Sequence, residues 1–218
     1  KSNPSALSLE ELLYAASITN NNAEKAAIYQ KVIDLYPNCP RGYNNLAAIK
    51  YGQGNLSEAT ALYGKALALA PNNADMNYNA GMAALASGNL ARAEELFGKA
   101  AGSAGNLSNA LGSLYIMKGD YARAKTAFGS VTTNNAALLQ ILNKEYSAAR
   151  NTLASVKNPD ATTAYLGAIV AARTNDRDAV YENLRKAVQA NKAYAVRAAT
   201  DLEFSKFFTD QAFLSIIK

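Results

Sequence analysis

The sequence predicts an all-α fold in which pairs of helices stack into a solenoid. Two stretches, 43–71 and 78–100, overlay at a fixed shift of 34 residues, which is a period typical of helical repeats. Within each stretch the apolar residues recur at helical spacing, as Ala59, Tyr63 and Ala66 do. A unit of this length cannot bury its apolar face alone, so neighbouring units are expected to stack on one another.

Turn and capping residues mark where the expected helices begin and end. Ser8 and Glu11 have the spacing of a capping box at the start of the first helix. Three dipeptides combine a glycine that ends one helix with a side chain that caps the next: Gly54-Asn55, Gly88-Asn89 and Gly119-Asp120. Prolines are expected in the turns between pairs, at Pro37, Pro40 and Pro71.

Small residues recur in the middle of the first helix of each pair, at Ala47, Gly81, Gly112 and Gly167. A glycine inside a helix costs about 1 kcal/mol relative to alanine. We therefore expect the backbone of a neighbouring helix to approach closely at these positions.

Beyond Val131 the repeat becomes shorter and irregular. Ala124 and Ala149 are 25 residues apart instead of 34, so the helix between them must be short. The last unit has one residue too many between Gly167 and Ala187. We expect about five to six helix pairs in all.

The repeated residues resemble the tetratricopeptide repeat family. One copy of its pattern consists of Tyr43, Leu46, Ala47, Gly54, Asn55, Leu56, Ala59, Tyr63, Ala66 and Pro71. A weaker copy precedes it and has Lys25 at the helix-contact position where the family pattern has alanine. The resemblance implies an α-α superhelix that binds proteins and has no catalytic activity.

Three segments are expected from these patterns: a flexible N-terminal segment over 1–5, repeats over 6–191, and aromatic capping helices over 192–218. The last segment contains Phe204, Phe207, Phe208 and Phe213. We expect it to cover the final repeat with these rings and with Val196, Leu202 and Ile217, because a solenoid leaves its last apolar face open. The alternative is that the phenylalanines form an exposed surface for a partner.

The composition argues against an enzyme. The chain has no histidine and a single cysteine, Cys39, which excludes Ser-His and Cys-His pairs and leaves too few ligands for a zinc site. Gly64-Lys65 and Gly98-Lys99 lack the flanking residues of a phosphate-binding loop. No cofactor or metal is expected.

The charge pattern argues against nucleic-acid and membrane partners. The formal net charge is +5, but the 22 basic residues are scattered, and several, such as Lys31, Lys65 and Lys99, recur at one position of the second helix. A phosphate-tracking site would need clustered cations. No apolar run is long enough for membrane insertion by this segment.

The resemblance implies that the first helices line a concave groove. Its candidate lining residues are Arg41, Asn44, Asn45, Tyr51, Asp75, Tyr78, Asn79, Met82, Asn109, Ser113, Ile116 and Met117. Carboxamides both donate and accept hydrogen bonds, so they can satisfy the backbone of an extended peptide. Alternatively, Asn45 and Asn79 hydrogen-bond within the array. The carboxylate clamp of chaperone-binding members is not reproduced, since Asp75 occupies a position where the clamp has a cation. Binding of a C-terminal carboxylate tail is therefore disfavoured.

The sequence therefore predicts a protein-interaction scaffold that binds a peptide or protein segment in its groove. The alternative is a structural assembly element of a larger envelope protein that packs through its convex face or its aromatic C-terminus. The C-terminal segment looks like the closing helices of tetratricopeptide proteins of bacterial envelopes. This resemblance favours the bacterial periplasm or the outer membrane as the location, with the cytoplasm as the alternative.

Overall fold

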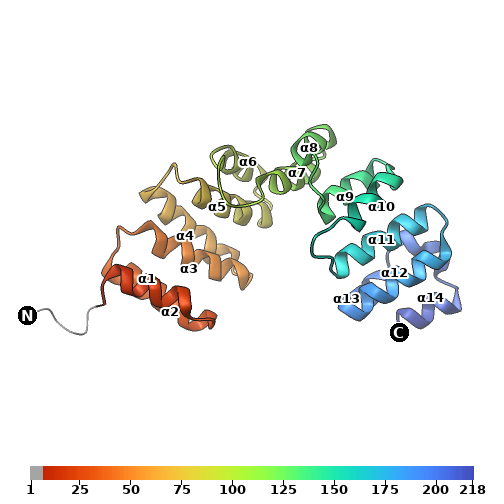
Figure 1. Cartoon of the computed structure of the whole chain (residues 1–218), viewed down its shortest axis with the longest axis horizontal. Helices are drawn as coiled ribbons and strands as arrows, with labels where there is room; N and C mark the ends of the chain where they lie inside the picture. The colour runs from red at the N-terminus through yellow and green to blue at the C-terminus, as the bar shows by residue number, and fades with distance from the viewer. Residues whose placement is uncertain (1–6) are drawn as a thin grey trace, which may run out of the picture. The chain divides into compact units, whose positions relative to one another are not determined.

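The structure is a computed structural model that describes residues 7–218, and all its regular elements in this range are helical (Figure 1). The N-terminal segment expected over 1–5 lies outside the described residues. The chain divides into two compact units, residues 1–118 and 119–218. The prediction of an all-α array of helix pairs is confirmed.

The first unit contains seven helices among its described residues. They are α1 (Leu9–Ile18), α2 (Asn22–Leu35), α3 (Pro40–Gly52), α4 (Leu56–Leu69), α5 (Ala74–Ala86), α6 (Leu90–Gly98) and α7 (Leu107–Met117). Each helix packs against the next one in the chain. In addition α3 contacts α5, and α5 contacts α7, so these first helices form a continuous wall.

The second unit contains shorter helices at its start and a cap at its end. They are α8 (Tyr121–Phe128), α9 (Asn134–Leu142), α10 (Tyr146–Ala154), α11 (Ala161–Arg173), α12 (Arg177–Ala190), α13 (Ala193–Ala198), the 3-10 helix η1 (Leu202–Phe207) and α14 (Gln211–Ile216). The helix expected to be short, α9, has nine residues.

Glycines in the left-handed region end the first helices of three pairs, as predicted. The φ angles of Gly54, Gly88 and Gly119 are +77°, +76° and +73°. The same turn recurs in the second unit without glycine, since Lys144 and Asn175 have φ angles of 62° and 57°. The repeat geometry therefore continues where its sequence pattern fades.

The core of the first unit consists mainly of alanines and a few large side chains from α3 to α7. A Cβ on Gly81 would lie 2.5 Å from the Phe97 ring of the paired helix α6. A Cβ on Gly167 would lie 3.0 Å from Oδ1 of Asn183. The expectation of a close helix backbone is therefore wrong at these two glycines: they make room for a side chain of the second helix.

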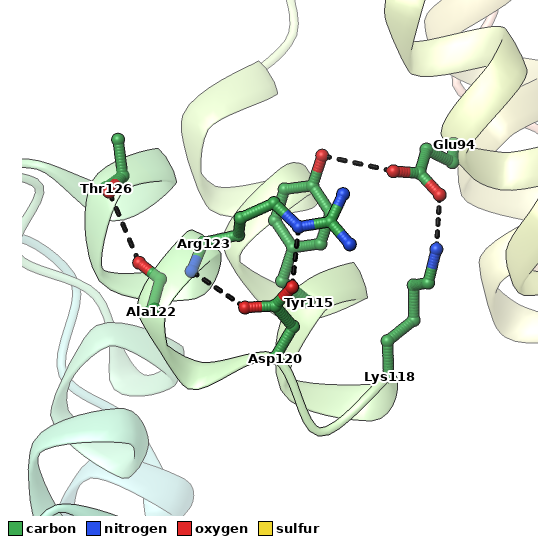
Figure 2. A network of polar contacts seen from close by, with 7 residues as sticks. All are labelled: Glu94, Tyr115, Lys118, Asp120, Ala122, Arg123 and Thr126. Atoms are coloured by element: carbon green, nitrogen blue, oxygen red, sulfur yellow. Dashed lines mark hydrogen bonds and ion pairs between the residues drawn. The ribbon is translucent and has the colours of Figure 1, made fainter.

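The last pair of the first unit is joined to α7 by polar contacts around Glu94 of α6 (Figure 2). The Tyr115 hydroxyl donates to Oε1 of Glu94 at 3.3 Å, and Lys118 forms an ion pair with the same carboxylate. In the second unit, Asp120 caps α8 by accepting from the backbone N of Arg123 at 3.0 Å and from its Nε at 2.6 Å.

The C-terminal segment packs against α11 and α12. Phe204, Phe207 and Phe213 are buried in one core with Tyr165 and Leu184. This arrangement follows from the aromatic content of the segment, because each large ring removes much apolar surface from water.

Two residues assigned to this lid from the sequence do not take part in it. Val196 is 75% exposed and Leu202 is 79% exposed. Both belong to short helical turns, where the helical period places some apolar positions on the outer side.

Candidate functional site

The wall formed by α3, α5 and α7 carries all twelve residues predicted to line the groove, and all of them belong to the first unit. Most are half-buried, whereas Arg41, Asp75 and Met117 are exposed. Because α3 contacts α5 and α5 contacts α7, side chains on this face can act on one ligand.

A chain of three carboxamides crosses from α5 to α3. Nδ2 of Asn79 donates to Oδ1 of Asn44 at 3.2 Å, and Nδ2 of Asn44 donates to Oδ1 of Asn45 at 3.0 Å. A carboxamide offers two N–H donors and one accepting oxygen. At the two ends of the chain, Nδ2 of Asn45 and Oδ1 of Asn79 have no hydrogen-bond partner among residues 7–218.

Other polar residues of this face are already engaged in the fold. Arg41 forms an ion pair with Glu10 of α1 at 3.2 Å. Oδ1 of Asp75 accepts from the backbone N of Ala104 at 2.7 Å, which fixes the loop before α7. The Ser113 hydroxyl donates to the carbonyl of Asn109 in its own helix at 2.7 Å.

Two tyrosines of the first unit are shielded from water, since Tyr63 of α4 is part of the core and Tyr78 of α5 packs against it. A Cβ on Gly105 would lie 2.3 Å from the Tyr78 ring, so this glycine admits the ring to its place beside Phe97. Burial raises the pKa of Tyr78. Burial, with a smaller effect from the nearby Tyr51, raises the pKa of Tyr63 to about 12. These phenols are therefore neutral at physiological pH.

Apolar side chains are exposed on α7, the last helix of the wall, and on α1, which precedes the wall in the chain. Met117 of α7 is 54% exposed, and on α1 Tyr14 is 67% exposed and Ile18 is 64% exposed. The sequence analysis missed Tyr14 and Ile18. The repeat length could have identified them, because Tyr14 and Ile18 lie 34 residues before Ala48 and Gly52 of α3.

A cleft of about 430 Å³ lies between α2 and the second half of α3. Its polar lining consists of Asn22, Lys25, Tyr29, Asn45 and Gln53. Asn45 thus belongs both to the carboxamide chain and to this cleft.

The side chains of residues 7–218 contain no group of three or more His, Cys, Asp or Glu residues that could hold a metal ion. Within the same range, no helix has both the length and the hydropathy needed to cross a membrane.

The comparison with protein families identifies the repeat. Residues 50–114 match the family described as tetratricopeptide repeat. This part of the chain belongs to that family. The matched residues include α4, α5 and α6, which have the clearest sequence pattern. Among them, α5 is the central helix of the wall. The tetratricopeptide repeat fold is a protein-interaction scaffold, so it indicates proteins or peptides as partners.

Solved structures show that this fold extends over nearly the whole chain. The PilF protein of Pseudomonas aeruginosa has a TM-score of 0.66 at 19% identity, covering 93% of this chain and 96% of PilF. A tetratricopeptide repeat protein from Parabacteroides merdae has a TM-score of 0.72 at 16% identity, covering 100% of this chain and 86% of that chain.

PilW, described as a widely conserved type IV pilus biogenesis factor, has a TM-score of 0.68 at 18% identity and covers 92% of this chain and 95% of its own. At these identities the likeness concerns the fold alone. No curated protein matches the chain by sequence.

Proposed function

We propose that the chain is a non-catalytic scaffold that binds an extended peptide or protein segment along the wall of α3, α5 and α7. The observation that carries this proposal is the pair of free ends of the carboxamide chain. Asn45 presents a donor and Asn79 an acceptor, and a peptide backbone offers one of each per residue. This pairing does not depend on the side chains of the peptide.

The internal bonds of the carboxamide chain hold these ends in place. A side chain that is already oriented loses less rotamer freedom when a ligand binds. Asn45 and Asn79 can therefore hydrogen-bond within the array and contact a ligand at the same time. The exposed Tyr14, Ile18 and Met117 add apolar contact area that the fold itself does not use.

The alternative, docking through the aromatic C-terminus, receives less support. Phe204, Phe207 and Phe213 are buried in the core of the second unit and are not free for a partner. Packing through the second helices remains an outcome that the test below detects.

The test starts with a peptide selected on the full chain from a displayed random library. Its affinity is then measured by calorimetry with Asn45→Asp, which keeps the oxygen that Asn44 donates to but removes the free N–H groups. We expect a loss of about tenfold or more, since a hydrogen bond and its desolvation are involved. Lys65→Ala, an exposed change on the second helix α4, should have no effect.

A second variant avoids any effect on the carboxamide chain. Tyr14→Ala combined with Met117→Ala changes exposed side chains only, so the fold should be unaffected and peptide affinity should fall. Unchanged affinity in both groove variants, each shown to be folded, would overturn the proposal. Loss of binding in Lys65→Ala instead would favour the second helices as the docking surface.

A further inference from the structure

The three methionines of the sequence all belong to the first unit and differ in how far they are exposed to solvent. Met76 of α5 is buried, with 5% of its surface exposed. Met82 is half-buried and packs against the core. Met117, the last residue of α7, is 54% exposed. A reagent dissolved in water therefore reaches Met117 more readily than the other two.

The thioether of an exposed methionine is open to oxidation by peroxides. With hydrogen peroxide, the sulfur forms a bond to one oxygen, the O–O bond breaks, and the second oxygen leaves as water. The sulfur is oxidised to a sulfoxide while the peroxide is reduced. A methionine sulfoxide reductase removes the oxygen as water, and two thiols of the reductant are oxidised to a disulfide. The modification is thus reversible, and it turns an apolar side chain into a polar one.

Contacts at both ends of α7 hold this helix against its neighbours. Oδ1 of Asp75 accepts from the backbone of the loop before α7 at 2.7 Å. At the other end, the Tyr115 hydroxyl donates to Glu94 of α6 at 3.3 Å, and Lys118 forms an ion pair with the same carboxylate (Figure 2). Met117 contributes to none of these bonds. Its oxidation should therefore change the surface of α7 and leave the helix in place.

Met117 is part of the wall to which we assign the peptide, and there it offers apolar contact area. A peptide side chain packed on Met117 would cover a sulfoxide oxygen, and burying a polar group without a hydrogen-bond donor weakens binding. We propose that Met117 is an oxidation site through which peroxides regulate peptide binding to the wall of α3, α5 and α7. This inference rests on the proposed function, because the modified side chain acts through its contact with the peptide.

The site is tested by treating the full chain with dilute hydrogen peroxide. Mass spectrometry of the digested chain follows sulfoxide formation at each methionine over time. We expect Met117 to react about tenfold or more faster than Met76, because a buried sulfur reacts only when the structure opens locally. Equal rates at Met117 and Met76 would overturn the assignment.

The effect on binding is measured by calorimetry with the library-selected peptide, before and after peroxide treatment. We expect oxidation to weaken binding about tenfold or more, as for the loss of one large apolar contact, and a methionine sulfoxide reductase should restore the affinity. Met117→Leu keeps an apolar side chain without sulfur, so peroxide should not alter whatever affinity it has. Met76→Leu and Cys39→Ser, which lie outside the wall or in the core, should respond to peroxide as the parent does.

Protection by the peptide separates this inference from the proposed function. A peptide bound along the wall should cover Met117 and slow its oxidation relative to Met76. Without protection the peptide does not reach Met117 and this inference is overturned, while Asn45→Asp still tests the wall by itself.

Protection of Met117 with unchanged affinity after oxidation would leave binding to the wall intact and overturn the regulatory site. A response to peroxide that persists in Met117→Leu would also overturn it, because another residue would then be responsible. Circular dichroism of the oxidised chain checks that its helices remain. A loss of helix would attribute the weaker binding to unfolding and would contradict the proposal.

Discussion

Nδ2 of Asn79 on α5 lies 3.2 Å from Oδ1 of Asn44 on α3 and donates a hydrogen bond to it. The two residues are 35 positions apart, one more than the repeat length, so the bond joins non-equivalent positions of neighbouring repeats. It orients Asn79 with its oxygen free and lets Asn44 orient Asn45 in turn. The helix contact thereby positions the ligand-facing groups.

Breaking this chain at its centre should destabilise the first unit. Asn44→Ala removes two neutral hydrogen bonds, each of which contributes about 0.5 to 1.5 kcal/mol. Because all three residues are half-buried, we expect the lower part of that range. Urea unfolding should give a coupling of about 0.5 kcal/mol or more between Asn44→Ala and Asn79→Ala in a double-mutant cycle.

Asn151→Ala is the matched control for this cycle. Asn151 is exposed on α10 and reports only the gain in helix propensity from asparagine to alanine. Additive effects of Asn44→Ala and Asn79→Ala would contradict the structural role of their bond.

Gly81→Ala should destabilise the chain although alanine favours helices. The new methyl would lie 2.5 Å from the buried Phe97 ring, and such overpacking costs about 1 to 3 kcal/mol. Gly64→Ala on α4 meets nothing within 4 Å and should stabilise by up to about 1 kcal/mol. Thermal unfolding of the two variants measures this contrast. A Gly81→Ala variant as stable as Gly64→Ala would show that the ring has room to move.

The repeat could be predicted where its residues are chemically constrained. Gly54 and Gly88 adopt φ angles that favour glycine, and Asn55 and Asn89 cap the following helices. The glycine and the asparagine of each turn can therefore be recognised in the sequence. In the second unit Lys144 takes the same backbone conformation. A non-glycine residue tolerates this region at a cost, so the turn persists while its sequence signal is lost.

The candidate site was only partly predictable for a different reason. The 34-residue register places residues on the first-helix face, and the structure puts all twelve on α3, α5 and α7. Register does not determine which polar groups are satisfied, because Asp75 bonds to Ala104 and Arg41 to Glu10 through contacts between different helices or loops. The cleft beside Lys25 likewise depends on how far α2 lies from α3.

The stability of the chain should fall at alkaline pH, in part through Tyr63. Its pKa is raised from 10.0 to about 12, mainly by burial. The unfolded chain therefore loses this proton first as pH rises. The contribution is complete below about pH 10 and is lost as pH rises toward the folded value.

Tyr63→Phe keeps the ring and removes the ionising group. The difference in unfolding free energy between the parent and Tyr63→Phe should be constant below about pH 10 and should shift in favour of the variant between about pH 10 and 12. Urea unfolding at matched pH values measures it, and lysine titration cancels in the difference. Parallel curves up to about pH 12 would refute the assigned shift.

The C-terminal cap offers the sharpest contrast between neighbouring apolar residues. Phe204 is fully buried and contacts the rings of Tyr165 and Phe213, with centroid distances of 5.6 and 6.0 Å. Phe204→Ala should cost about 3 to 5 kcal/mol, because it removes the burial of the ring and leaves a cavity. Leu202→Ala, two residues away and exposed, should change stability by no more than about 0.5 kcal/mol.

Urea unfolding followed by far-UV circular dichroism distinguishes two explanations of a destabilised Phe204→Ala. If Phe204 caps the last pair, the loss of helix should begin in α11 to α14 and precede that of the first unit, since the two units have separate cores. Hydrogen exchange locates this early opening. If instead Leu202→Ala proves as costly as Phe204→Ala, the cap is packed differently, and the apolar residues on its outer side contribute to stability.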